Sequence, residues 1–272
     1  SLTIKEAIYQ FVAIYAVVET VMLHNLEKVR NYNGRYLDNV TKSATEKNIL
    51  NLWIKRAKYS MLGENAMAFA SEAEFENALI NMLTSSCGWE PEVLRYKTEK
   101  ELLQNWANIL FENNRSIDRL NDYPLTDGEM QQIIEQINVL RTPLKLNGFI
   151  NGRSVSITRD NPDDKEHFGK EISLKIYDRQ EIAAGQSRYQ IAQQPKFAAK
   201  TNMLPTRRGD FILLINGMPL IHVELKKSGI PVSQAYNQIE KYSHEGVFTG
   251  LFSLVQVFVA MNPEETVYFA NP

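Results

Sequence analysis

The chain has 272 residues, of which 44% are hydrophobic and 23% charged, and its formal net charge is -2. This composition is that of an ordinary globular protein, and it excludes a disordered chain or a polycation that holds nucleic acid over its whole surface. The single cysteine, Cys87, excludes an internal disulfide and a zinc site built from cysteines, and it fits a reducing, cytoplasmic setting.

Residues 1–65 are predicted to form a helical N-terminal extension. Apolar residues recur at steps of three and four from Thr3 to about Arg30, and a second helix is predicted from Ser43 to Leu62. The most apolar stretch, residues 7–23, is shorter than the roughly 20 apolar residues of a membrane span. We therefore expect no membrane association, and a bracing or assembly role for these helices.

Three capping boxes predict the next helices. The pattern Ser-Glu-Ala-Glu at residues 71–74 opens a helix from Glu72 to about Ser86. The same pattern predicts helices at about 98–112 and 127–141, which together form a helical insertion at about 98–141, and Pro143 is expected to end the helical part. Glu72 and Glu76 lie one turn apart on one face, although acids in a first turn also favour the helix dipole without any further role.

Short strands follow the helices. They are predicted at Val155–Thr158, Ile172–Tyr177 and Tyr189–Ala192, and near the end of the chain at Phe252–Ala260 and Val267–Ala270. The run Phe252–Ala260 is apolar almost throughout, which indicates a central strand buried on both faces. The segment from Arg159 to Gly169 is polar and charged, so it is expected to be an exposed loop with His167 at the surface.

A β-hairpin is predicted over residues 210–225, with Asn216-Gly217 as its turn. The second strand ends in Glu224-Leu225-Lys226, and alternation places Glu224 and Lys226 on one face. Asp210 lies near the open end of the same hairpin. Two carboxylates can bind a hard divalent cation, and a lysine can stabilise charge on a reacting phosphate, so these residues fit metal-assisted phosphodiester cleavage.

The register of this hairpin decides whether Asp210 and Glu224 share a face, because residues directly opposite each other lie on one face. With a plain two-residue turn, Asp210 would face Val223 and point away from Glu224. One Mg2+ could not then hold both carboxylates, since its ligands lie at only about 2.1 Å. We therefore predict a loop of odd length, such as Asn216–Met218, or a β-bulge between the two acids.

Polar residues around the hairpin are candidates for contact with nucleic acid. Gln238 and Tyr242 are four apart in a predicted helix and share a face. Residues 195–245 carry seven Lys or Arg against four Asp or Glu, which concentrates positive charge, including Arg208 and Lys227, around the proposed site. His222 shares a face with Glu224 but is predicted to be a packed histidine at the edge of the core.

The spacing Asp-x13-Glu-x-Lys resembles the PD-(D/E)xK nuclease core, with Gly209 where that name puts proline. Gln-x3-Tyr after the second strand resembles the accessory motif of the RecB-like branch. The stretch RRGDFILLINGMPLIHVELKKSG, preceded by RYQIAQQPKF, resembles the amino-terminal endonuclease domain of the R (restriction) subunit, HsdR, of type I restriction-modification enzymes. This resemblance extends over roughly Ser71 to Pro272.

The resemblance implies an α/β fold with a mixed central sheet flanked by helices, in an endonuclease domain at residues 66–272 that cleaves double-stranded DNA. The implied cofactor is Mg2+, and an early helix would add an acid to the site. The implied residues are Asp210, Glu224 and the Leu225 carbonyl as metal ligands, Lys226 and Glu76 (or, second, Glu72) as further catalytic residues, and Gln238, Tyr242, Arg208 and Lys227 as DNA-binding residues.

The resemblance also implies partners. These are methyltransferase and specificity subunits, with translocase domains C-terminal to this stretch in the full-length chain, while ATP and S-adenosylmethionine would serve only the complete complex. Two alternatives stay open: another RecB-like repair nuclease or junction resolvase, and a non-catalytic DNA-holding or assembly module. A third is a surface hairpin whose charges are only solvated.

Overall fold

The computed structural model describes residues 69–116, 119–150, 154–176, 187–198 and 206–270. The two helices predicted within residues 1–65 therefore lie outside the described residues. The chain divides into two compact units. One contains residues 1–89, 224–237 and 259–269, and the other contains residues 90–223, 238–258 and 270–272. Strands β8, β9 and β10 and helix α8 each contribute residues to both units.

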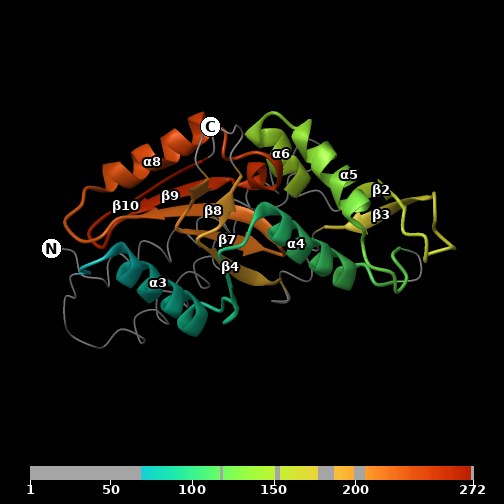
Figure 1. Cartoon of the computed structure of the whole chain (residues 1–272), viewed down its shortest axis with the longest axis horizontal. Helices are drawn as coiled ribbons and strands as arrows, with labels where there is room; N and C mark the ends of the chain where they lie inside the picture. Colours follow the sequence, from blue (N-terminus) through green and yellow to red (C-terminus); the bar gives the residue numbers. More distant parts are fainter. Residues whose placement is uncertain (1–68, 117–118, 151–153, 177–186, 199–205, 271–272) are drawn as a thin grey trace, which may run out of the picture. The chain divides into compact units, whose positions relative to one another are not determined.

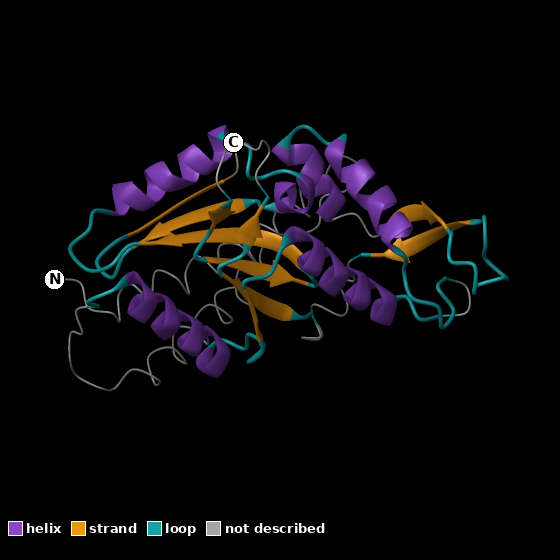
Figure 2. Ribbon diagram, viewed as in Figure 1, coloured by secondary structure: helices purple, strands orange, loops and turns teal. Residues whose placement is uncertain are grey.

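The described residues contain both helices and strands, with most of the helices before the strands β2 to β8 (Figures 1 and 2). The helices are α3 (Glu72–Ser86), α4 (Glu99–Asn113), α5 (Asp127–Asn138), α6 (Pro143–Ile150), α8 (Val232–His244) and the 3-10 helix η1 (Gly250–Leu254). The strands are β1 (Val93–Arg95), β2 (Ser154–Thr158), β3 (Glu171–Lys175), β4 (Tyr189–Gln193), β5 (Lys196–Phe197), β6 (Arg207–Arg208), β7 (Phe211–Ile215), β8 (Met218–Leu225), β9 (Val257–Met261) and β10 (Thr266–Ala270). Within the described part of the chain, every helix is too short or too polar to cross a bilayer.

The three capping patterns begin helices at the predicted residues. The Thr98 hydroxyl accepts the N–H of Glu101 at 3.3 Å, and the Glu101 carboxylate accepts the N–H of Thr98 at 2.9 Å. Thr126 and Glu129 make the same reciprocal pair at the start of α5. Each pair satisfies two N–H groups that the first turn would otherwise leave without acceptors, which explains the sharp starts of these helices.

Two predicted boundaries are wrong. Pro143 begins helix α6 rather than ending the helical part, because proline is well tolerated at the first helical position, where its missing N–H would have no acceptor. The apolar run Phe252–Ala260 is not one strand: η1 occupies residues 250–254, and β9 starts at Val257. An apolar run of this length does not by itself distinguish a buried helix from a buried strand.

A mixed sheet of six strands, in the order β1-β4-β7-β8-β9-β10, forms the centre of the fold. β1 pairs parallel to β4, whereas β4 with β7 and β7 with β8 are antiparallel. The predicted class, an α/β fold with a mixed central sheet flanked by helices, is confirmed. Every residue of β7 and β8 is buried, as expected for strands covered on both faces.

The turn of the β7–β8 hairpin packs closely against helix α4. Asn216 and Gly217 both have positive φ, at 50° and 83°. A Cβ atom added to Gly217 would lie 2.9 Å from the Cα atom of Trp106, which has no room to move because it belongs to the helix backbone. Glycine is therefore required here both by conformation and by the close approach of α4.

Most of the loop between β2 and β3 is exposed, as predicted, but His167 is buried there in an ionic network, so its predicted position at the surface is wrong. The side chains of Arg159, Glu129 and Asp164 are fully buried, and His167 is 8% exposed. Arg159 donates from Nη1 to Glu129 at 2.7 Å and from Nε to Asp164 at 2.9 Å, and Asp164 also accepts from Nδ1 of His167 at 3.0 Å. The network fastens this loop to the first turn of α5, which lies beside β2 (Figure 2).

Candidate active site

The register of the β7–β8 hairpin decides which side chains share a face. The pairing shifts by one residue between Leu213 and Leu214, and Leu220 on β8 is the extra residue. Next to the turn the pairs are Ile215 with Met218 and Leu214 with Pro219, and beyond the shift they are Leu213 with Ile221, Ile212 with His222 and Phe211 with Val223. This irregularity is a β-bulge, in which two residues of one strand oppose one residue of the other.

The bulge confirms the prediction of an odd loop or a bulge between Asp210 and Glu224. The turn itself has two residues, so the three-residue loop offered as an example is not the solution that the chain adopts. Pro219, which lacks an N–H for the ladder, adjoins the bulge. Asp210 directly precedes Phe211 and Glu224 directly follows Val223, so the register continued by one residue assigns both acids to one face.

Asp210 lies just outside the ladder, and its side chain is partly exposed. Its backbone carbonyl accepts the N–H of Gln194 at 2.7 Å. Upstream, the chain passes through the buried Gly209 to the short strand β6, which pairs with β5. The backbone that leads to Asp210 is thus held by hydrogen bonds, although β6 is not part of the six-stranded sheet.

His222 is packed among aromatic rings in the same unit as Asp210. Its ring centre lies 5.1 Å from that of Phe248 and 5.9 Å from that of Phe197, and the residue is fully buried. Burial lowers the pKa of His222 to about 4, and the negative charge of Asp210 opposes this shift. The imidazole is therefore neutral at pH 7, which agrees with the predicted packing role.

Glu224 and Leu225 end strand β8, and Lys226 follows it, in the other unit. Glu224 and Leu225 are fully buried, and the Lys226 side chain is 12% exposed. The Lys226 ammonium donates to the Leu225 carbonyl at 2.9 Å and lies 3.3 Å from the carboxylate of Glu72. The N–H of Lys226 donates to the Met261 carbonyl of β9, which fixes the backbone at this point.

Helix α3 supplies the two glutamates that the sequence offered as the additional acid. Glu76 is 3% exposed, and Glu72 is half-buried and pairs with Lys226. The structure therefore brings Glu72, the second choice, directly to a predicted site residue, and buries Glu76 one turn further along the helix. Because the two residues share a face, spacing alone could not distinguish their contacts.

Gln238 and Tyr242 form a hydrogen-bonded chain. Gln238 donates from Nε2 to the Tyr242 hydroxyl at 2.8 Å, and this hydroxyl donates to the backbone carbonyl of Arg208 at 2.9 Å. Tyr242 is 6% exposed, whereas the side chains of Arg208 and Lys227 are exposed. The structure thus connects the Gln-x3-Tyr motif to the segment that leads to Asp210.

Arg207 and Glu245 make a contact that sequence reasoning missed. Arg207 donates from Nε and Nη2 to the two oxygens of Glu245, both at 2.7 Å. This pair joins β6 to the residue that follows α8. Nothing in the local sequence indicates it, because the two residues are 38 positions apart and each is typical of a solvated surface.

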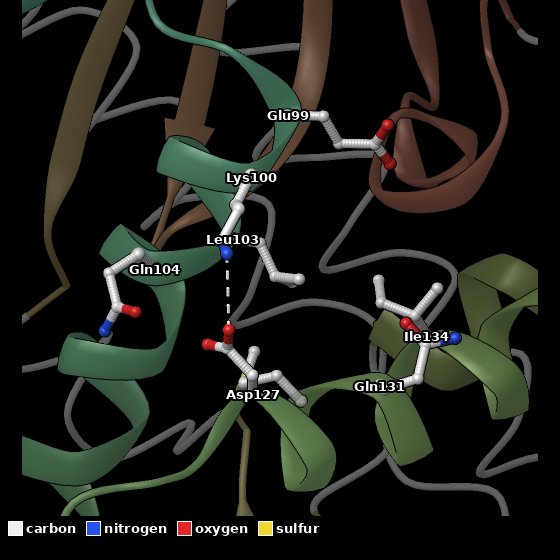
Figure 3. Close-up of a pocket in the computed structure, with 8 residues that line it drawn as sticks. Glu99, Lys100, Leu103, Gln104, Asp127, Gln131 and Ile134 are labelled. Atoms are coloured by element: carbon white, nitrogen blue, oxygen red, sulfur yellow. Dashed lines mark ion pairs between the residues drawn. The ribbon is translucent and has the colours of Figure 1, made fainter. Parts of the chain in front are cut away.

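Other clusters and hollows offer little beside this site. Among the described residues, no group of three or more His, Cys, Asp and Glu side chains is arranged to hold a metal ion. A hollow of about 360 Å³ lies between α4 and α5 (Figure 3). It is lined by Glu99, Lys100, Leu103, Gln104, Asp127, Met130, Gln131 and Ile134, none of which is a predicted site residue.

Comparisons with known proteins place this geometry in context. The family described as type I restriction enzyme R protein N terminus matches residues 69–272. The chain is 34% identical over 205 residues to the endonuclease subunit of a type I restriction enzyme of Staphylococcus aureus strain COL, and 33% identical over 205 residues to that of a Staphylococcus saprophyticus strain. These matches cover 75% of this chain and 20% of each relative, so the chain spans about a fifth of their length. A 66-residue match, 46% identical, to the EcoprrI endonuclease subunit of Escherichia coli covers 24% of this chain and 21% of that protein.

Proposed function

Because the chain belongs to the family of type I restriction enzyme R protein N termini, we propose that it is a Mg2+-dependent endonuclease domain that cleaves phosphodiester bonds of double-stranded DNA. The observation that supports this most is the β-bulge at Leu220, because the register beyond it, continued by one residue, would give Asp210 and Glu224 the same facing. A hairpin with only a structural role has no need of this facing.

Asp210, Glu224 and the Leu225 carbonyl are the residues that would hold the ion. All three donate oxygen, which suits the hard Mg2+ ion, and one or two carboxylates are its usual protein ligands. Glu224 and Leu225 are buried at the end of β8, while Asp210 is partly exposed. When bound, Mg2+ supplies Lewis-acid chemistry: it polarises the phosphate and lowers the pKa of a bound water.

Lys226 would stabilise negative charge on the reacting phosphate or orient the attacking water. Its ammonium is held between the Leu225 carbonyl and the Glu72 carboxylate, which restricts its position. Glu72 is accordingly a positioning residue for Lys226 in this proposal. Glu76, buried on the same helix, remains the candidate for a further acid at the site.

The DNA contacts divide into two groups. Arg208 and Lys227 are exposed and would pair with backbone phosphates, which gives affinity without sequence specificity. Gln238 and Tyr242 would act beside the DNA, since the hydrogen bond from the Tyr242 hydroxyl holds the backbone of Arg208. Recognition of a DNA sequence is then left to other subunits.

The remaining parts of the complete enzyme are also proposals. The full-length protein would carry translocase domains after this stretch and would assemble with methyltransferase and specificity subunits in the cytoplasm. ATP and S-adenosylmethionine would serve those parts and not this chain. The relatives are named as endonuclease subunits of type I restriction enzymes, which supports such an assembly.

The test is to replace Asp210 or Glu224 by alanine in the complete enzyme. Each change should reduce DNA cleavage by at least about 100-fold, because the charge of the reacting phosphate loses its counter-ion. ATP-driven translocation, measured by triplex displacement, should be unchanged. Normal cleavage by both variants would remove the assignment, and cleavage of branched rather than linear DNA by the wild type would favour a junction resolvase.

A further inference from the structure

The segment Arg207–Asp210 is held by contacts at three points. The Arg207 guanidinium forms its two-bond pair with Glu245, the Arg208 carbonyl accepts the Tyr242 hydroxyl, and the Asp210 carbonyl accepts the N–H of Gln194. Glu245 directly follows helix α8, Tyr242 lies near the end of that helix, and Gln194 lies in the bend after β4. All these residues belong to one compact unit.

This segment needs such contacts because the main ladder ends before it. Phe211 opposite Val223 is the last pair of this ladder, and Asp210 lies one residue beyond it. The position of its carboxylate therefore depends in part on the backbone upstream, where the three contacts lie. Metal ligands must lie within a few tenths of an ångström of their place, and hydrogen-bonded neighbours supply that accuracy.

The Arg207–Glu245 pair is well suited to this task. Its side chains are 25% and 16% exposed, so water competes little for either partner. The guanidinium lowers the pKa of Glu245 below its ordinary value, and the carboxylate raises the pKa of Arg207, so both groups stay charged at neutral pH. A planar fork with two parallel bonds also fixes orientation, which a single contact does not.

We propose that the Arg207–Glu245 pair is a positioning device for the Asp210 carboxylate, and that it sets the affinity of the site for its divalent ion. The inference rests on the proposed function, because it takes Asp210 as a metal ligand. Arg207 and Glu245 act through the backbone of residues 207–210 and touch neither the ion nor the DNA. Loss of the pair should therefore weaken metal binding more than it slows cleavage at saturating metal.

The experiment measures Mn2+ binding to the full-length subunit without nucleotide, by the loss of the free-ion signal in electron paramagnetic resonance. The site of interest is the one that Asp210→Ala removes. Glu245→Gln and Arg207→Lys should each raise its dissociation constant by about tenfold, the lower end of what loss of a supporting contact costs a metal site. The double exchange Arg207→Glu with Glu245→Arg should recover most of that affinity, because it rebuilds a charged pair.

A matched control is available in the same unit. Arg188 makes a two-bond pair with Glu90, at 2.7 and 3.0 Å, but holds a different part of the chain. Glu90→Gln should lower the melting temperature about as much as Glu245→Gln and leave the Mn2+ affinity unchanged. Cleavage should also be measured over a range of Mg2+ concentrations. Glu245→Gln should raise the half-saturating Mg2+ concentration more than it lowers the maximal rate, whereas Glu90→Gln should leave the half-saturating concentration unchanged.

Two results would overturn the proposal while leaving Asp210 as a ligand: wild-type Mn2+ affinity in a folded Glu245→Gln variant, or an equal loss of affinity in Glu90→Gln. Wild-type Mn2+ binding by Asp210→Ala is a different outcome. It would remove the proposed metal site itself, and the positioning role with it.

Discussion

The buried network around Arg159 and the candidate site at the end of the β7–β8 hairpin both consist of acidic and basic side chains. The two groups differ in their exposure and in their hydrogen-bond partners. In the buried network, all five N–H donors of Arg159 have acceptors: Glu129, Asp164 and the backbone carbonyls of Pro124, Tyr123 and Leu120. At the end of the hairpin, Asp210 is partly exposed beyond the last ladder pair. A saturated cluster has no donor left for a ligand and stabilises the fold, whereas the acid at the strand end is the one that we propose as a metal ligand.

The largest expected effect is on stability, from Arg159→Met. The change leaves the carboxylates of Glu129 and Asp164 buried without their cation, which costs about 3–5 kcal/mol when a buried pair is broken. Urea unfolding of the subunit measures this loss. Molecules that remain folded should cleave DNA at the normal rate, and a loss of cleavage larger than the loss of folded protein would show that the network also serves the reaction.

The reverse behaviour is expected for Lys226→Met. Removal of one group that stabilises transition-state charge typically costs about 100-fold or more in rate. Stability should change by less than about 1 kcal/mol, since the partner Glu72 is 45% exposed and solvent can replace the ion pair. Single-turnover cleavage measures the rate, and a melting curve measures the stability. A variant that cleaves normally but melts at a lower temperature would show that Lys226 stabilises the fold and does not serve the reaction.

The smallest effect is a change in pH dependence, tested by Asp164→Asn. Burial raises the pKa of Asp164, but hydrogen bonds from Arg159 and His167 outweigh it, so the pKa lies below its ordinary value of 3.8. An acid whose pKa is lowered by folding contributes stability above its unfolded pKa and loses it as the pH falls through its folded pKa.

Wild-type protein should therefore lose stability as the pH falls below about 4, and the asparagine variant should lose less over the same range. The comparison uses denaturant unfolding of both proteins from pH 7 downward. Glu129→Gln serves as a partner measurement, because it breaks the same network at another atom. Parallel curves for wild type and Asp164→Asn would contradict the assigned pKa shift.

Much of the fold could be predicted because it is encoded locally. The capping boxes give the starts of α3, α4 and α5, and the Asn-Gly pair gives the two-residue turn. The buried network could not be predicted, because Glu129 and Arg159 are 30 residues apart and a charged loop is usually solvated. Only the tertiary packing of the β2–β3 hairpin on α5 decides that these charges are buried.

The candidate site was predictable in its residues but not in its contacts. Local patterns located the two acids and the lysine. They could not choose between Glu72 and Glu76, which occupy one helical face, and they gave no sign of the Arg207–Glu245 pair. The bulge is a special case. The turn preference of Asn-Gly favours a regular ladder between the two strands, and only the requirement that Asp210 and Glu224 face one ion predicted an irregular ladder.

The bulge also provides a rule for comparing sequences. Thirteen residues separate Asp210 from Glu224, and an odd number between two facing residues cannot occur in a regular hairpin with a two-residue turn. A related protein with one residue fewer would place the same acids opposite each other with no bulge, whereas one with two fewer, a residue from each strand, would still need it. In a relative that keeps the two-residue turn, the count of residues between the two acids therefore indicates whether the backbone of the hairpin is irregular.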